Sequence, residues 1–199
     1  MIEVEQKFIL SEKDEQLLTR GANFLGEKTF TDIYYDTADY ALGKNDIWLR
    51  RRGEKWEVKI PTGNPGKKVT RQYQEIEGEE KIRQVFDVAP KNDFISDIAE
   101  YGYAPFCECQ TTRRKYAREK FIIDLDVASC GEDFSYRIGE IEMMVPSEEQ
   151  AEFATEEILQ FAKSLGLEAL PVRGKVVEYL KRKKPDHYQA LMEAGVVWE

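Results

Sequence analysis

The stretch that decides the fold is Ile2-Glu3-Val4-Glu5-Gln6-Lys7-Phe8, in which charged and apolar residues alternate. A period of two is typical of a β-strand whose two faces meet different surroundings. Glu3, Glu5 and Lys7 share one face of this strand, and the opposite face is apolar. A charged face on a single strand is ordinarily exposed to solvent, so its interpretation depends on the charges of the other strands.

The same alternation recurs along the chain and predicts about eight strands. They cover residues 2–9, 30–36, 46–52, 54–60, 70–77, 113–120, 121–128 and 135–145. Pro and Gly within residues 61–68 predict a turn. Helical patterns cover residues 11–20, 79–86, 93–101, 147–165, 175–182 and 186–193. The clearest helix is 147–165, which Ser147 caps and Gly166 ends.

Several of the predicted strands carry acids and bases together on one face, as in Arg50/Arg52, Asp124/Asp126 and Glu140/Glu142. Eight antiparallel strands can close into a barrel. If amphipathic helices cover the outside, the apolar strand faces point outward and the charged faces line the inside. Because unpartnered buried charges are very costly, that interior must be a wet tunnel or hold a ligand of matching charge. A metal–polyphosphate complex satisfies both the acids and the bases.

The expected fold class is therefore α+β, mainly antiparallel β, with a closed eight-stranded barrel of charged interior and helices packed outside. The 199 residues fit a single domain over 1–199. A net charge of −9 argues against binding to nucleic acid or to a membrane surface. No apolar run is long enough for a membrane span, and the charged N-terminus does not resemble a signal peptide. No interface signal is visible, so we expect a monomer.

The cysteines and the single histidine receive no functional role. Cys107, Cys109 and Cys130 are an odd number without metal-ligand spacing, which favours a reduced, cytoplasmic setting. The single histidine, His187, argues against histidine-based zinc sites and Ser-His-Asp triads.

The chain resembles the CYTH superfamily, the triphosphate tunnel metalloenzymes. The family signature Glu-x-Glu-x-Lys is present at residues 3–7. The rest of the family pattern follows in order as residues 48–52, 56–59, 73–75, Arg114, 124–126, 139–142 and Lys175. The resemblance implies a closed tunnel, a divalent metal cofactor and hydrolysis of a terminal phosphate.

Within the superfamily the chain is most similar to the animal thiamine triphosphatases, on residues 31–52 and 179–189. This similarity implies hydrolysis of thiamine triphosphate to thiamine diphosphate and phosphate. The alternatives are an inorganic triphosphatase acting on tripolyphosphate or another organic triphosphate hydrolase of this fold. An adenylyl cyclase and a polyphosphate-binding module without turnover also stay open.

The resemblance also assigns site residues. Mg²⁺, or Mn²⁺, is expected on a set of acids, which are Glu3, Glu5, Asp124, Glu140 and Glu142. Asp126 faces the same way but receives no role. The phosphate-binding bases are Lys7, Arg50, Arg52, Lys59, Arg114 and Lys175. Surface charge or pairing with the acids is the plainer interpretation of these bases.

Adjacent residues on a strand point to opposite sides, so Arg51 is expected outside the tunnel. For the same reason Arg113 is expected to point away from the side that Arg114 faces. Glu75 and Lys59 are the candidates for handling the attacking water, and a depressed Lys59 pKa would let it act as a base.

Three aromatic residues, Tyr34, Tyr73 and Trp48, are candidates for the tunnel wall, although packing alone would also explain them. Trp48 shares the face of Arg50 and Arg52, and it is expected to stack on the thiazolium cation.

Overall fold

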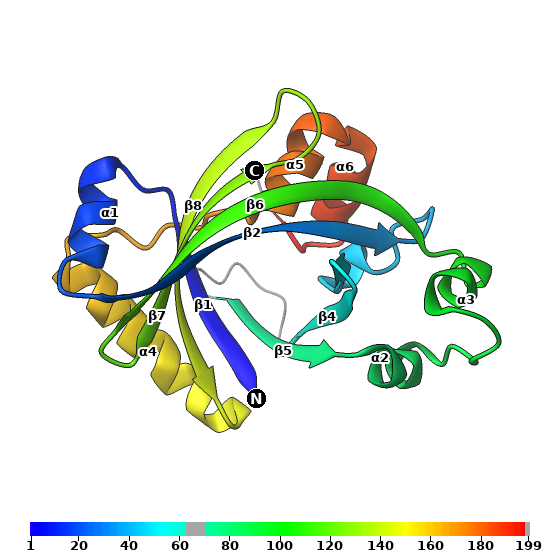
Figure 1. Ribbon diagram of the computed structural model, residues 1–199, viewed down its shortest axis with the longest axis horizontal. Helices are drawn as coiled ribbons and strands as arrows, with labels where there is room; N and C mark the ends of the chain where they lie inside the picture. Colours follow the sequence, from blue (N-terminus) through cyan, green and yellow to red (C-terminus); the bar gives the residue numbers. More distant parts are fainter. Residues whose placement is uncertain (63–70, 198–199) are drawn as a thin grey trace.

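The computed structural model, which describes residues 1–62 and 71–197, is a closed antiparallel β-barrel (Figure 1). Its strands are β1 (Ile2–Phe8), β2 (Asn23–Asp36), β3 (Trp48–Arg52), β4 (Lys55–Pro61), β5 (Arg71–Glu77), β6 (Ala104–Arg118), β7 (Phe121–Ser129) and β8 (Ser135–Val145). Their order around the barrel is β1-β5-β4-β3-β2-β6-β7-β8, and β8 pairs with β1. The predicted eight-stranded barrel is confirmed.

Strands β2 and β6 are much longer than their patterns predicted. They pair with each other from Asn23↔Ala117 to Asp36↔Ala104, with register shifts between Phe24 and Gly26, whose φ is +135°, and between Tyr34 and Tyr35. The added segments lack a clear apolar alternation, so only the cross-strand pairing reveals them. The predicted turn at 61–68 lies mostly outside the described residues, and Pro61 ends β4.

The helices fall close to their predicted positions. They are α1 (Glu12–Thr19), α2 (Glu79–Phe86), α3 (Phe94–Glu100), α4 (Glu148–Ser164), α5 (Lys175–Lys183) and α6 (Pro185–Glu193), with a short 3₁₀ turn η1 (Gly43–Asn45). Ser11 begins α1 through a reciprocal capping box with Asp14. Among these helices of residues 1–62 and 71–197, none has the length and apolar character to cross a bilayer.

The apolar faces of the strands point outward, as the charge pattern predicted. On one side, Val4, Ile123 and Ile141 are fully buried against Ile158 and other apolar residues of α4. Figure 1 shows α4 lying along this side of the barrel, next to β1 and β8. Burying a large aliphatic side chain is worth about 1.5–3 kcal/mol, so this packing holds the charged faces inward.

Two further cores complete the molecule. Trp56 and Val58 of β4 pack beneath Ile82 of α2 and Phe94 of α3. At the other end of the barrel, helix α5 packs against inward-facing side chains, so that its first residue, Lys175, reaches the interior.

Candidate active site

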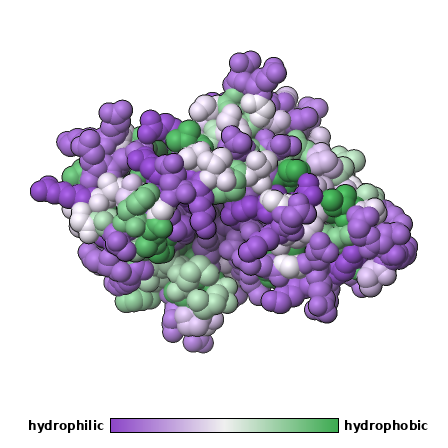
Figure 2. All heavy atoms as spheres, viewed as in Figure 1, coloured by the Kyte–Doolittle hydropathy of each residue, from purple (hydrophilic) through white to green (hydrophobic). Residues whose placement is uncertain are grey.

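The barrel encloses a cavity of about 810 Å³, lined by side chains from all eight strands and from α5. This volume lies within the range of about 300–1,000 Å³ that is usual for small-molecule sites. Most of the lining side chains are charged or aromatic. Figure 2 shows hydrophilic side chains around the hollow in the middle of this face.

The acids in the cavity form two groups that share Glu142. One group joins Glu3 and Glu5 to Glu142, and the other joins Asp124 and Glu140 to it, with carboxylate oxygens within 4.8 Å of one another. All five side chains are buried. Burial and the nearby carboxylates of Asp124 and Glu3 raise the pKa of Glu142 well above its ordinary value.

Bases of the tunnel contact these carboxylates, but the raised pKa of Glu142 shows that negative charge is still crowded around it. Oxygen-only ligands suit hard divalent cations, so the donor set fits Mg²⁺ or Mn²⁺.

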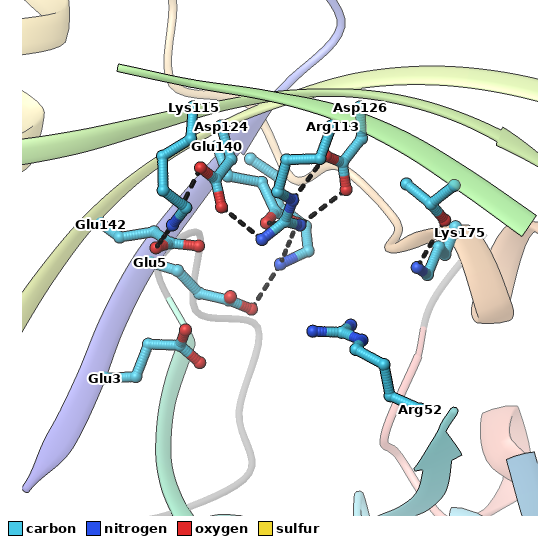
Figure 3. A network of polar contacts seen from close by, with 12 residues as sticks. Glu3, Glu5, Arg52, Arg113, Lys115, Asp124, Asp126, Glu140, Glu142 and Lys175 are labelled. Atoms are coloured by element: carbon cyan, nitrogen blue, oxygen red, sulfur yellow. Dashed lines mark hydrogen bonds and ion pairs between the residues drawn. The ribbon is translucent and has the colours of Figure 1, made fainter. Parts of the chain in front are cut away.

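The predicted bases Lys7, Arg50, Arg52, Lys59 and Lys175 all line the cavity. Arg52 and Lys175 both contact Asp32, each at 2.7 Å, although Lys175 lies 143 residues further along the chain. Burial would raise the pKa of Asp32, but the Arg52 hydrogen bond and the charges of Arg50 and Lys175 hold it below its ordinary range. Figure 3 shows Arg52 and Lys175 on the side of the cavity away from Glu3 and Glu142.

Lys59 does not have the depressed pKa that was expected of a general base. Its ammonium group pairs with Glu3 and lies 3.7 Å from Glu5 and 3.9 Å from Glu75. Burial would lower the pKa of Lys59, but these carboxylates raise it well above its ordinary value. Lys59 therefore stays protonated in this arrangement. Glu75, the other candidate for handling water, lines the cavity and also contacts Arg50 at 3.2 Å.

Tyr34, Tyr73 and Trp48 line the cavity as predicted. The Trp48 indole N–H donates to Asp46 at 2.9 Å, and the Tyr73 hydroxyl lies 3.1 Å from the same carboxylate. Asp46 is buried, and it has a left-handed backbone conformation that ends η1. This contact fixes the orientation of the Trp48 ring in the cavity wall.

The sequence of residues 1–171 matches the CYTH domain. The chain belongs to the CYTH family. It is 30% identical to the thiamine-triphosphatase of Homo sapiens, over 98% of this chain and 91% of that protein. It is 29% identical to the thiamine-triphosphatase of Macaca fascicularis, with the same coverage of both chains.

Solved structures show the same fold. A protein from Pyrococcus horikoshii superposes with a TM-score of 0.64 at 21% identity, covering 91% of this chain and 99% of its own. A putative adenylyl cyclase from Hippeastrum, described as having a dominant triphosphatase activity, superposes with a TM-score of 0.58 at 16% identity. This superposition covers 92% of this chain and 96% of the Hippeastrum chain.

In this CYTH barrel the prediction for Arg114 is wrong, because Arg113 occupies the tunnel instead. Arg113 contacts Asp124, lies 2.6 Å from Asp126 and 3.2 Å from Glu140, and is largely buried. Arg114 points outward and pairs with Glu15 of α1 at 2.7 Å. The missed signal is Tyr116, which shares the face of Arg114 and packs against the outer core around α4.

Several further cavity residues received no role from the sequence. They are Asp46, Glu57, Arg71, Arg113, Lys115 and Asp126. Asp32, which contacts the cavity bases Arg52 and Lys175, also received none. Asp126 already had the correct strand parity, and it forms a two-pronged contact with Arg113. The signal for Asp32 was equally simple, since it lies two residues before Tyr34 on the same strand face.

The three cysteines meet at one place, which differs from the expected set of reduced thiols. Cys109 forms a disulfide with Cys130, and the Cys107 sulfur lies 3.5 Å from that of Cys109. His187 is buried in α6, where its ring stacks on Tyr40 at 4.1 Å between centroids.

The adjacent residues Arg50 and Arg51 should respond differently to truncation. Arg50 lines the cavity, whereas Arg51 does not. We expect Arg50→Ala to lower kcat/KM for the triphosphate substrate by about thirtyfold or more, because truncating a buried charged contact costs at least about 2 kcal/mol. Arg51→Ala should stay within about twofold of the wild type in the same assay. A larger loss for Arg51→Ala would place β3 one residue out of register.

Proposed function

We propose that this protein hydrolyses thiamine triphosphate to thiamine diphosphate and phosphate, with Mg²⁺ as its cofactor. The observation that supports this best is a closed tunnel in which buried acid groups face a set of buried bases. A metal–triphosphate complex carries both of the charges that such a lining accepts. The 30% identity to human thiamine-triphosphatase over almost the whole chain supports the choice of substrate.

The bases bind the phosphate oxygens in this proposal. Without substrate they pair with tunnel acids, as Arg52 and Lys175 do with Asp32. An incoming triphosphate offers oxygens that replace these carboxylates, and the arginines can bind them through two parallel hydrogen bonds. Lys7, Arg50 and Arg113 take the same role from their positions on β1, β3 and β6. The chain thereby holds the terminal phosphorus in a fixed position for attack by water.

The two acid groups, Glu3/Glu5/Glu142 and Asp124/Glu140/Glu142, are the places that would hold Mg²⁺, which would neutralise charge on the phosphate oxygens. Lys59 stays protonated and stabilises negative charge that develops as the phosphoanhydride bond breaks. Glu75 is half-buried and opens on the same cavity, so its carboxylate can orient the attacking water and accept its proton. The products are thiamine diphosphate and inorganic phosphate, and no covalent intermediate is required.

Phosphate release is the direct test. The purified protein is offered thiamine triphosphate, tripolyphosphate and ATP in turn, with Mg²⁺ and with EDTA, and inorganic phosphate is measured. We expect release from thiamine triphosphate with Mg²⁺ and none with EDTA. Faster release from tripolyphosphate would make the protein an inorganic triphosphatase, and binding without release would make it a binding module. We further propose that the protein is a cytoplasmic monomer. Size-exclusion chromatography with light scattering tests the oligomeric state.

Selectivity for thiamine should depend on Trp48. The tunnel bases recognise a triphosphate tail that all three compounds share, so discrimination must come from the head group. An indole face attracts the thiazolium cation by about 0.5–2 kcal/mol. We expect Trp48→Ala to lower kcat/KM for thiamine triphosphate by about threefold to thirtyfold, with a much smaller change for tripolyphosphate.

Trp48→Phe is the matched variant, because it keeps a ring but loses the hydrogen bond to Asp46. It should fall between the wild type and Trp48→Ala for thiamine triphosphate. An equal loss for thiamine triphosphate and tripolyphosphate would show that Trp48 supports the barrel wall instead of contacting thiamine.

A further inference from the structure

Lys115 is a cavity base that the phosphate-binding scheme leaves unused. It lies on the inward face of β6, two residues beyond Arg113, and it is paired in register with Asp124 of β7. Its ammonium nitrogen is 3.0 Å from Asp124 Oδ1 and 3.8 Å from Glu142 Oε2. Figure 3 shows its side chain reaching from β6 toward these two carboxylates.

The two oxygens of Asp124 are divided between two bases. Arg113 contacts Oδ2, and Lys115 contacts Oδ1. Lys115 is also the basic partner of Glu142. Within residues 1–62 and 71–197, no other basic nitrogen lies within 4.0 Å of the Glu142 carboxylate. Lys115 therefore lies between Asp124, which belongs to one acid group, and Glu142, which both groups share.

The other lysines that contact the acids differ from Lys115 in one respect. Lys7 and Lys59 also face the position of the triphosphate, and the proposed function moves them from carboxylate to phosphate. Lys115 is paired in register with Asp124, and the proposed function gives it no contact with phosphate. A single charge at about 3–4 Å in a partly buried site strongly opposes a second cation at the same carboxylates.

We propose that Lys115 takes the place of a second divalent ion at Asp124 and Glu142, so that the wild-type tunnel binds one such ion tightly. This inference rests on the proposed function, since it assumes that a divalent cation binds among these acids. The ion is held by Glu3, Glu5 and the remaining oxygen of Glu142. At Asp124 and Glu142 the positive charge of Lys115 stands where a second ion would bind.

The test counts bound Mn²⁺ by electron paramagnetic resonance and by isothermal titration calorimetry, with no substrate present. We expect one tightly bound Mn²⁺ in the wild type. Lys115→Met removes the charge and keeps the length of the side chain, so a second Mn²⁺ should bind at least tenfold more tightly than any second ion in the wild type. Lys115→Arg keeps the charge and should behave as the wild type does.

Lys28→Met is the matched control, because Lys28 also lines the cavity from β2. In the described part of the chain, no carboxylate oxygen lies within 4.0 Å of its ammonium nitrogen. Its removal should leave Mn²⁺ binding unchanged. The Lys115 side chain is 39% exposed, so we expect its variants to fold, and circular dichroism with thermal unfolding checks this. Lys115→Gln serves as a second neutral variant.

Equal ion numbers and affinities in the wild type and in both neutral Lys115 variants would overturn the inference. An equal gain in Lys28→Met would do the same, since it would show only a general charge effect. If the wild type binds Mn²⁺ and releases phosphate from thiamine triphosphate, either result leaves the proposed function standing. If the wild type neither binds Mn²⁺ nor requires a metal for release, the proposed metal-dependent function fails as well.

Discussion

Glu5→Gln should abolish metal-dependent hydrolysis of thiamine triphosphate, with a loss of at least about a thousandfold in kcat. Glu5 is buried, and its carboxylate lies within 4.8 Å of those of Glu3 and Glu142. The amide keeps the shape of the side chain but removes the negative charge that a hard cation requires. Phosphate release at saturating Mg²⁺ measures the loss, and calorimetric titration with Mn²⁺ should show weakened ion binding in parallel.

Glu77→Gln provides a matched control, since Glu77 ends β5 and does not line the cavity. It should retain the activity and the Mn²⁺ affinity of the wild type. Full activity with Mg²⁺ in a folded Glu5→Gln protein would remove Glu5 from the proposed metal site.

The second large effect is expected at Arg113. Arg113→Met should lower kcat/KM by about a hundredfold to a thousandfold, because it removes a buried base that we propose binds phosphate. Truncating such a charge costs about 2–5 kcal/mol, part of it from carboxylates left without a partner. Here those are Asp124, Asp126 and Glu140, so thermal unfolding is measured together with the kinetics. Arg113→Lys keeps the charge and should recover part of the activity.

Arg114→Met is the adjacent control. Its partner Glu15 lies outside the barrel and also binds Arg137, so the lost ion pair should cost at most about 1 kcal/mol of stability. Its kcat/KM should stay within about threefold of the wild type. If Arg114→Met proved inactive while Arg113→Met remained active in the same assay, the side-chain orientation along β6 would have to be reversed.

The alternation of charged and apolar residues was sufficient to predict the barrel. It worked because a strand has only two faces, and a face with Glu3, Glu5 and Lys7 can be buried only around something polar. The same parity placed Arg50 and Arg52 inside and Arg51 outside. Pairs such as Glu140 and Glu142 point into the cavity together for this reason, so most of the candidate site could be predicted from local pattern.

The tertiary structure decided what local pattern leaves open. On β6 every residue from Arg113 to Lys115 is basic, so charge gives no parity there, and the pairing with β7 sets which side chains point inward. The contact of Lys175 with Asp32 joins residues 143 positions apart, and it exists only because α5 packs across one end of the barrel. Long-range strand pairing also raised the pKa of Lys59, by surrounding it with acids from β1 and β5. The sequence by itself determined which charges share a strand face; only the closed barrel decided which of them became neighbours, because that depends on strand register and not on local periodicity.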